Sequence, residues 1–272
     1  MSIDGKVTFI GAGNMGEALI RGILGASLVA PEQLWVGEPR EARRTELRDR
    51  YGINAIVDNG RAVSGASVVV LAIKPQIFAR VIDEIVPSVA EDALIVSIAA
   101  GQDIAGMEAR FGSTARVVRT MPNVACIVGE GATALAAGRN VSDDDLALAR
   151  QIFDSVGMSV VLDEAQLDAV TGLSGSGPAY VFMVIEALAD AGVKVGLSRW
   201  DAHALACQTV MGSAKLVIDT KEHPGQLKDR VCSPGGTAIA AVHTLEAGGL
   251  RTTLMNAVEV ATRRSVELGL KR

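Results

Sequence analysis

Aromatic side chains are scarce in this sequence, which holds two Trp, two Tyr and five Phe among 272 residues. Apolar residues nevertheless make up 49% of the chain, so a core must be built mainly from Ala, Val, Leu and Ile. Such cores suit layered α/β sheets and closely packed helices better than aromatic-rich β-sandwiches. The length allows two domains, or one large one.

Cysteine is rare as well. Cys126, Cys207 and Cys232 are odd in number, widely spaced and without a CxxC pair, which argues against a disulfide framework and for free thiols in a reducing compartment. The first residues show no basic stretch followed by an apolar one, and the apolar runs 68–73 and 93–100 are too short to span a bilayer. We therefore expect a cytoplasmic protein.

Basic runs are absent, and the net charge is −5. A protein that neutralises a phosphate backbone is normally basic, so nucleic acid is a poor candidate partner. The three histidines form no HxxxH or HExxH pattern, so we expect no metal site. The sequence also has no GxSxG nucleophile elbow.

Short β-branched runs alternate with helical patterns in the first half. Most of the runs lack polar alternation, as expected of parallel strands covered on both faces. The expected strands are Val7–Ile10, Leu34–Val36, Val68–Ala72, Leu94–Ile98 and Val117–Val118, with Thr133–Ala137 and Val160–Leu162 as possible extensions. The expected helices are Glu17–Leu24, Glu41–Tyr51, Ile77–Val86, Asp103–Phe111 and Asp143–Val156. This order predicts an α/β fold with a Rossmann-like, doubly wound parallel sheet.

The strand pattern stops after about residue 164. The remaining segments predict helices at Pro178–Ala191, Ser198–Thr220, Thr237–Ala247 and Leu250–Leu268. Helix Ala204–Ile218 is apolar or small over most of its circumference, which a small helical domain cannot bury by itself, so we expect a homodimer. The predicted domains are a dinucleotide-binding domain, residues 1–163, and an all-α dimerisation and substrate domain, residues 164–272.

A glycine-rich turn follows the first strand and opens a helix. In Gly11-Ala12-Gly13-Asn14-Met15-Gly16, the first glycine permits the tight turn, the second lets a pyrophosphate approach the backbone, and the third lets the helix pack on the sheet. The helix N-terminus offers unpaired N–H groups to the phosphates. The pattern alone is weak, but in this strand–turn–helix context it predicts a bound dinucleotide.

The end of the second strand leaves open which dinucleotide binds. Glu38 is placed to accept hydrogen bonds from adenosine ribose hydroxyls, which favours NAD(H), whereas Arg40, Arg43 or Arg44 could pair with the 2′-phosphate of NADP(H). All four residues could also be solvated surface charges.

Two further segments follow the carboxyl ends of strands, where ligands of open α/β sheets bind. They are Ala72-Ile73-Lys74-Pro75 and Met121-Pro122-Asn123. In the helical half, Leu173–Tyr180 and Cys232–Thr237 are turns before helices. Gly235-Gly236 lets successive N–H groups converge, which suits a small carboxylate. We expect this turn to face the Gly13 turn across one cleft, in the chain or in its dimer.

Together these motifs resemble the pyrroline-5-carboxylate reductase family. The matching stretches follow the family's order over nearly the whole chain: Phe9–Gly16, Ala72–Pro75, Ser97–Gly101, Met121–Asn123, Gly172–Tyr180 and Glu222–Thr237. The resemblance implies a Rossmann domain, an all-helical dimerisation domain and, in many members, rings of dimers. It implies reduction of 1-pyrroline-5-carboxylate to L-proline by hydride transfer from NAD(P)H.

The resemblance also implies site residues. Cofactor contacts would come from the Gly11–Gly16 turn, Asn59, Ala72–Pro75 and Met121–Asn123. The substrate carboxylate would rest on the Ser233–Thr237 turn with the ring near Ser176, so Ser176 and Thr237 are the candidate catalytic residues. The expected substrate contacts are Ser176, Ser233, Gly235, Gly236 and Thr237.

One departure concerns the proton. Many relatives have threonine at the position of Ala238, whose side chain here cannot donate, so the imine proton would come from water or the substrate would bind as the iminium. Two alternatives stay open. A β-hydroxyacid dehydrogenase would need a lysine soon after Gly172–Gly177, where this chain has Pro178–Phe182; a non-catalytic NAD(P)-sensing protein would bind cofactor without turnover. Cofactor preference, proline feedback and activity on six-membered imines are not determined by the sequence.

Overall fold

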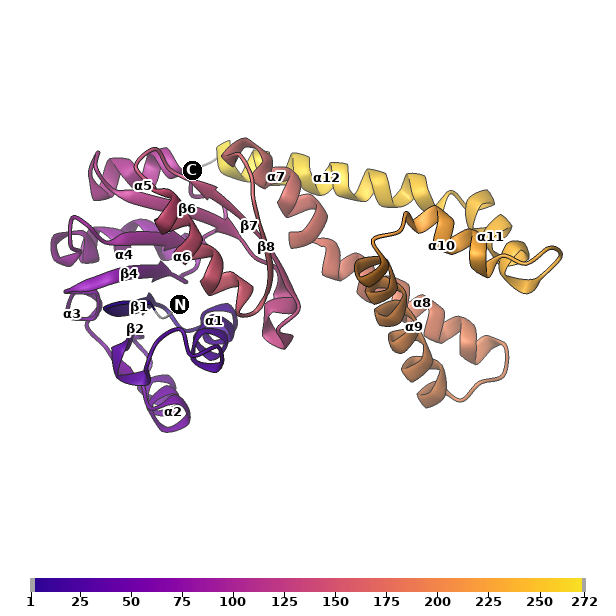
Figure 1. Ribbon diagram of the computed structural model, residues 1–272, viewed down its shortest axis with the longest axis horizontal. Helices are drawn as coiled ribbons and strands as arrows, with labels where there is room; N and C mark the ends of the chain where they lie inside the picture. The colour runs from indigo at the N-terminus through magenta and orange to yellow at the C-terminus, as the bar shows by residue number, and fades with distance from the viewer. Residues whose placement is uncertain (1–2, 271–272) are drawn as a thin grey trace. The chain divides into compact units, whose positions relative to one another are not determined.

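The computed structural model describes residues 3–270, which divide into two compact units. The first unit runs through Gly175 and is joined by the end of the last helix, from Ala261 on; the second is Ser176–Val260. The domain boundary predicted between residues 163 and 164 remains a prediction. Figure 1 shows the sheet of the first unit and the helices of the second.

One eight-stranded sheet forms the centre of the first unit, with the strand order β3-β2-β1-β4-β5-β6-β7-β8. Within the described chain its neighbours run parallel, except that β7 is antiparallel to β6. The strands are β1 (Lys6–Ile10), β2 (Leu34–Gly37), β3 (Asn54–Ile56), β4 (Ala66–Leu71), β5 (Leu94–Ser97), β6 (Arg116–Met121), β7 (Gly131–Ala137) and β8 (Gly157–Val161).

Helices cover both faces of this sheet, because alternate residues of a strand feed opposite core layers. Val7 and Phe9 of β1 lie in one buried cluster with α1, α2 and α6, and Ile10 lies in the other with α3, α4 and α5. The doubly wound α/β fold is therefore confirmed. These helices are α1 (Asn14–Gly25), α2 (Glu41–Tyr51), α3 (Asn59–Val63), α4 (Phe78–Ile85), α5 (Ile104–Phe111), α6 (Asp143–Asp154) and α7 (Leu167–Val170).

The second unit is helical, as predicted. Its helices are α8 (Gly177–Lys194), α9 (Arg199–Thr220), α10 (Pro224–Val231), α11 (Thr237–Ala247) and the first part of α12 (Leu250–Leu270). Ser198 caps α9 by accepting a hydrogen bond from the Asp201 N–H at 3.1 Å. α8 and α9 pack closely, since a Cβ added at Gly192 would lie 2.8 Å from the Cβ of Ala202.

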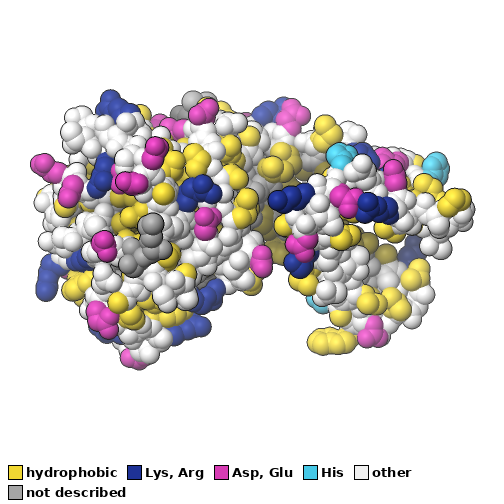
Figure 2. Space-filling view, viewed as in Figure 1, with side chains coloured by type: hydrophobic (Ala, Val, Ile, Leu, Met, Phe, Trp, Pro, Cys, Tyr) yellow, Lys and Arg dark blue, Asp and Glu magenta, His cyan; other side chains and the backbone are white. Residues whose placement is uncertain are grey.

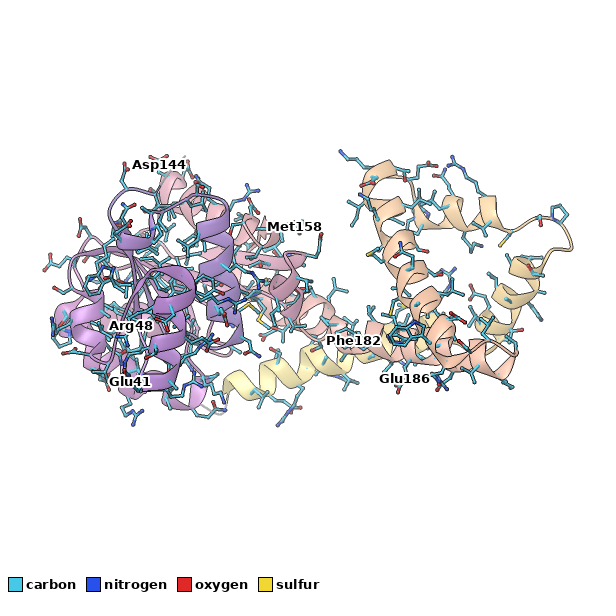
Figure 3. All side chains as sticks on the ribbon, turned by 90° about the horizontal axis from the view of Figure 1, so that it is seen from below. Glu41, Arg48, Asp144, Met158, Phe182 and Glu186 are labelled. Atoms are coloured by element: carbon cyan, nitrogen blue, oxygen red, sulfur yellow. The ribbon has the colours of Figure 1, made fainter. Side chains whose placement is uncertain are left out.

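Large apolar side chains lie exposed on this unit. Phe182 is 62% exposed and Trp200 83% exposed, whereas the buried apolar residues are Ala189, Ala202, Ala206 and Leu227. Hydrophobic side chains are visible over its surface in Figure 2, and Figure 3 labels Phe182 and Glu186 on α8. In the segment Ala204–Ile218, for which the sequence predicted more apolar surface than this unit can bury, Leu205, Met211, Leu216 and Ile218 are exposed. No helix within residues 3–270 combines the length and apolar character needed to cross a membrane.

Several features differ from or add to the expected elements. Four short segments were not predicted: β3, α3, α7 and α10. A π-helical turn, Thr171–Gly175, precedes α8. β7, one of the two possible extensions of the sheet, runs antiparallel to β6, a direction that was not predicted.

Candidate functional site

The turn between β1 and α1 can only be made by glycine at its first position. Gly11 has φ +89°, its N–H donates to the carbonyl of Gly37 at 2.9 Å, and an added Cβ would lie 2.6 Å from the carbonyl oxygen of Ala72. A Cβ at Gly16 would lie 2.8 Å from the Gly11 carbonyl oxygen. Both glycines therefore serve the close contact of α1 with the strand ends.

Gly13 has a different role. It is the N-cap residue of α1 and offers no side chain to the first N–H groups of the helix. An added Cβ would meet no atom within 4 Å. The N-terminus of α1 thus faces open space that the protein itself does not fill, as a pyrophosphate site requires.

A cavity of about 850 Å³ lies at this place. β1 and β4 both end here, and β1 is where the strand order reverses, which is where open α/β sheets bind ligands. The structure brings the following predicted cofactor residues together in its lining: Gly11, Ala12, Gly13, Asn14, Glu38, Arg40, Asn59, Ala72, Ile73 and Lys74.

Several lining residues were not predicted. Ile77, Arg80, Val81 and Glu84 come from α4 and the turn before it. Their spacing of three or four residues places them on one face of the predicted helix Ile77–Val86. That spacing, directly after Pro75, was the signal that could have found them.

Glu38 is the buried charge of this cavity. Its side chain is 4% exposed, and its Oε1 accepts hydrogen bonds from Arg40 Nε at 2.7 Å and from the Arg40 N–H at 3.1 Å. Its Oε2 lies 3.4 Å from the donating N–H of Ala12. Burial alone would raise the pKa of Glu38, but these hydrogen bonds and the Arg40 charge outweigh it and hold the pKa below its usual value.

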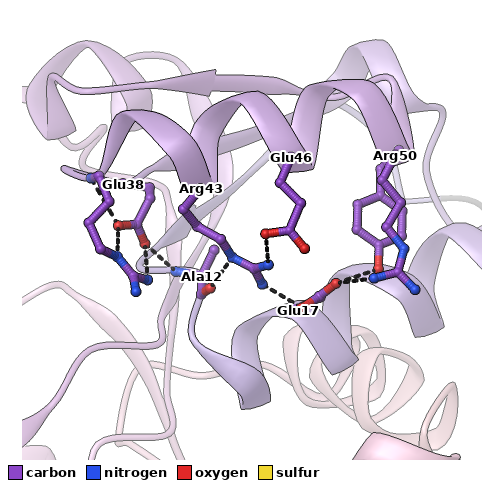
Figure 4. A network of polar contacts seen from close by, with 8 residues as sticks. Ala12, Glu17, Glu38, Arg43, Glu46 and Arg50 are labelled. Atoms are coloured by element: carbon purple, nitrogen blue, oxygen red, sulfur yellow. Dashed lines mark hydrogen bonds and ion pairs between the residues drawn. The ribbon is translucent and has the colours of Figure 1, made fainter.

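Arg43 fastens α2 to the glycine turn (Figure 4). Its Nε donates to the carbonyl of Ala12 at 3.0 Å, and its other nitrogens pair with Glu46 and Glu17. Glu17 also accepts from Arg50 at 3.0 Å and from the Tyr51 hydroxyl at 2.7 Å. Burial raises the pKa of Glu17, but its hydrogen bonds to Arg43 and Tyr51 outweigh that effect and lower it overall.

Asn59, at the start of α3, has an unsatisfied group in the lining. Its Oδ1 is buried and has no hydrogen-bond partner in the described protein. A Cβ at Gly37 would lie 2.3 Å from this oxygen, so glycine at the end of β2 leaves the amide its place. An unpaired buried acceptor is costly unless a ligand or water donates to it. Together with the open N-terminus of α1, whose N–H groups need acceptors, it fits a cofactor that carries both phosphate oxygens and donor groups.

The other predicted cofactor residues lie outside this lining in the described chain. Asn123 Oδ1 accepts from the N–H groups of Ala125 and Ala132, and its Nδ2 donates to the Ser174 carbonyl at 3.1 Å. The residues outside the lining are Met15, Gly16, Pro75, Met121, Pro122 and Asn123.

The turn before α11 differs in detail from the sequence expectation. Gly235 has φ +66°, and the N–H of Gly236 donates to the Ser233 carbonyl at 3.0 Å. Because that N–H is occupied, Gly236 does not offer it to a carboxylate, whereas the first N–H groups of α11, beginning with Thr237, have no acceptor within the helix. Ser176, the N-cap residue of α8, is half-buried and makes no side-chain capping bond.

The two glycine turns fall in different compact units, so their common cleft stays a prediction. Cys126, Cys207 and Cys232 are free thiols, as expected. Residues 3–270 contain no group of three His, Cys, Asp or Glu side chains arranged to hold a metal ion.

Comparison with known proteins follows the same two parts of the chain. Residues 6–101 match the family described as NADP oxidoreductase coenzyme F420-dependent, and residues 164–268 match the family described as pyrroline-5-carboxylate reductase dimerisation. A curated pyrroline-5-carboxylate reductase from Synechocystis sp. is 47% identical over 266 residues, covering 98% of this chain and 99% of that protein.

Solved structures agree. A pyrroline-5-carboxylate reductase from Coxiella burnetii superposes with a TM-score of 0.93 at 34% identity, covering 98% of this chain and 99% of that one. The pyrroline carboxylate reductase of Plasmodium falciparum, solved with NADP bound, gives a TM-score of 0.87 at 35% identity, covering 99% and 100%.

Proposed function

This chain belongs to the pyrroline-5-carboxylate reductase family, and from that premise we propose which of its residues bind the cofactor and the imino acid. The enzyme reduces 1-pyrroline-5-carboxylate to L-proline with NAD(P)H. A hydride and a proton are added across the C=N bond, and the nicotinamide, when bound, supplies the hydride.

The cofactor half of the proposal depends on one observation: the N-terminus of α1 opens at Gly13 into the cavity that also holds Glu38. The first N–H groups of α1 bind the pyrophosphate, and the positive end of the helix dipole favours its charge. Glu38 receives the adenosine ribose. Ala72, Ile73 and Lys74 line the cavity on the β4 side.

The substrate half lies at α11. The N–H groups of Thr237 and the following residues hold the substrate carboxylate, while the turn bond from Gly236 to Ser233 fixes the backbone before them. Ala238 has no hydroxyl, so the ring nitrogen takes its proton from water, or the substrate enters as the iminium. Ser176 lies beside the substrate ring in this proposal.

The helical segment is a dimerisation domain of the family, and the exposed Phe182 and Trp200 supply apolar surface for a second copy. We propose that dimers assemble further into a ring. The cytoplasm is the proposed compartment, because all three cysteines are free thiols.

The direct test is oxidation of NADH and of NADPH, followed by absorbance, on addition of 1-pyrroline-5-carboxylate. Proline must form in equal amount to the cofactor oxidised. Turnover with at least one cofactor is expected. No proline from either cofactor, in a protein that still binds them, would favour a sensing role instead.

A further inference from the structure

Glu38 occupies the position at which a Rossmann fold binds the adenosine ribose. It directly follows β2, and its N–H donates to the Ile56 carbonyl of β3 at 3.0 Å. This bond holds the Glu38 backbone at the carboxyl ends of the strands. Its carboxylate lies against the glycine turn, with Oε2 3.4 Å from the Ala12 N–H. An acidic side chain at this position accepts hydrogen bonds from the ribose hydroxyls of a cofactor without a 2′-phosphate.

Three arginines near Glu38 differ in how far they are committed to other partners. Arg43 is 14% exposed and binds Ala12, Glu17 and Glu46. Arg44 is 10% exposed and binds the carbonyls of Glu38 and Pro39 as well as Glu41.

Of these three arginines, Arg40 is the one that can change its anionic partner. Its side chain is 66% exposed, and its side-chain bonds within the described chain go to Glu38. Because the guanidinium end of this pair is exposed to solvent, it can turn to another anion once the buried Glu38 carboxylate is no longer there to hold it. The other cations of the cavity, Lys74 and Arg80, come from the segment after β4.

We propose that Glu38 makes this enzyme prefer NADH to NADPH, and that Arg40 is the residue that binds the 2′-phosphate once Glu38 is removed. The inference rests on the cofactor cavity of the proposed function and adds which cofactor the cavity selects. A 2′-phosphate carries almost two negative charges at neutral pH and would lie beside a buried carboxylate. The ribose hydroxyls of NADH instead donate to that carboxylate.

The charge of Glu38 supports this selection at neutral pH. Burial would raise the pKa of Glu38, yet the hydrogen bonds from Arg40 and Ala12 hold it below the usual glutamate value. The side chain is therefore ionised at pH 7 and accepts without donating. A buried charge next to the phosphate group is the repulsive element that specificity requires.

The preference for a cofactor that lacks the 2′-phosphate can be tested with two ligands that carry no nicotinamide and therefore cannot react. Calorimetric titration with ADP-ribose and with 2′-phospho-ADP-ribose measures the adenosine half of the site alone. We expect the unaltered enzyme to bind ADP-ribose at least tenfold more tightly. In Glu38→Ser the order should reverse, with ADP-ribose at least tenfold weaker and 2′-phospho-ADP-ribose at least tenfold tighter.

Arg40 supplies the second arm. Arg40→Gln should leave ADP-ribose affinity within threefold. The double variant Glu38→Ser/Arg40→Gln should lose most of the gain for 2′-phospho-ADP-ribose, because the Arg40 guanidinium next to position 38 is gone. Glu38→Gln, which keeps the side-chain volume, serves if Glu38→Ser unfolds; it should cut the discrimination at least threefold.

Glu46→Gln is the matched control, since Glu46 pairs with Arg43 on the same helix but lies outside the cavity lining. Its affinity ratio should stay within twofold of the unaltered enzyme. Equal affinity of the unaltered enzyme for both ligands, or an equal change for both in Glu38→Ser, overturns the inference and leaves the proposed function standing. Binding of neither ligand overturns both.

Discussion

The side-chain amide of Asn123 donates a hydrogen bond to the carbonyl oxygen of Ser174, 3.1 Å away. The bond joins the end of β6 to the π-helical turn Thr171–Gly175, two residues before Ser176 in the chain. Isolated π turns occur frequently at functional sites. Since Asn123 Oδ1 is also occupied by two backbone N–H groups, this side chain acts as a positioning residue for the turn.

Asn123→Asp tests that role selectively. A carboxylate can still accept from Ala125 and Ala132, but it cannot donate to the Ser174 carbonyl and places negative charge beside it. We expect kcat to fall at least tenfold, about 1.4 kcal/mol in activation free energy, with the Kd for NADH changed less than threefold. Steady-state rates and cofactor titration measure the two effects.

Asn140→Asp is the control for that substitution. Asn140 donates to the carbonyls of Ser113 and Ala115 in a loop after β7, so the same change removes the same kind of bond away from the cavity. It should lower stability and leave kcat within twofold. A similar loss of kcat in both variants would mean that Asn123 acts only through global stability.

Gly13→Ala should affect ligand binding without affecting the packing of the protein. The added methyl meets no protein atom within 4 Å, so the Tm should change by no more than about 2 °C. The same methyl enters the space assigned to the pyrophosphate, and NADH affinity should fall at least tenfold. Gly25→Ala, at the other end of α1 and equally unobstructed, should leave NADH affinity unchanged. Unaltered binding in Gly13→Ala would place the pyrophosphate elsewhere.

The local part of this site was predictable from sequence. The Gly11 turn needs a positive φ, and α1 needs close backbone contact with the strand ends, so glycines appear at fixed spacing. The strand ends themselves follow from short-range hydrophobic pattern. The partners of Arg40, Arg43 and Arg44 were not predictable, because the three arginines are equivalent in sequence. In the fold Arg43 reaches Glu17 of α1, Arg44 binds the carbonyls of Glu38 and Pro39, and Arg40 stays exposed.

Longer-range features left weaker signals. The bond from Asn123 to Ser174 joins residues far apart in sequence, for which no periodicity exists. The direction of β7 did leave a trace, because only residues 122–130 separate it from β6, fewer than the dozen or so that a parallel crossover needs. β3 is a three-residue edge strand, too short for a pattern.

Acid should weaken the contact between α1 and α2 through Glu17. Its pKa is lower in the folded protein than the ordinary glutamate value of 4.5, so the unfolded chain binds the proton more readily. The resulting stability is fully present above that ordinary value and is lost as the pH falls through the folded pKa. Glu17→Gln should lose about 2 kcal/mol of unfolding free energy at pH 7.

The difference between the two proteins should shrink as the pH falls below 4.5 and through the lowered folded pKa of Glu17, where the carboxylate becomes neutral. Urea unfolding at several pH values measures both curves. Glu32→Gln, at an exposed glutamate, should follow the unaltered protein throughout. If the Glu17→Gln curve runs parallel to the unaltered one at every pH, the ion pairs of Glu17 do not contribute to stability.

Gly236→Ala should disturb the substrate and spare the cofactor. The new Cβ would lie 2.3 Å from Ser233 Oγ and 3.2 Å from the Ser233 carbonyl oxygen, so the Ser233 hydroxyl must rotate away and the turn before α11 must shift by a few tenths of an ångström. The first N–H groups of α11 then lose their alignment toward a carboxylate. We expect the KM for 1-pyrroline-5-carboxylate to rise at least tenfold while NADH affinity stays within twofold.

Gly248→Ala, at the other end of α11, is the matched control because its Cβ makes only ordinary contacts, the nearest at 3.4 Å. Both KM values should then stay within twofold of the unaltered enzyme. A rise of equal size in the cofactor and substrate constants of Gly236→Ala would show that the turn supports the whole helical unit. The loss of affinity would then not be specific to the acid. The carboxylate would have to bind at a different set of N–H groups.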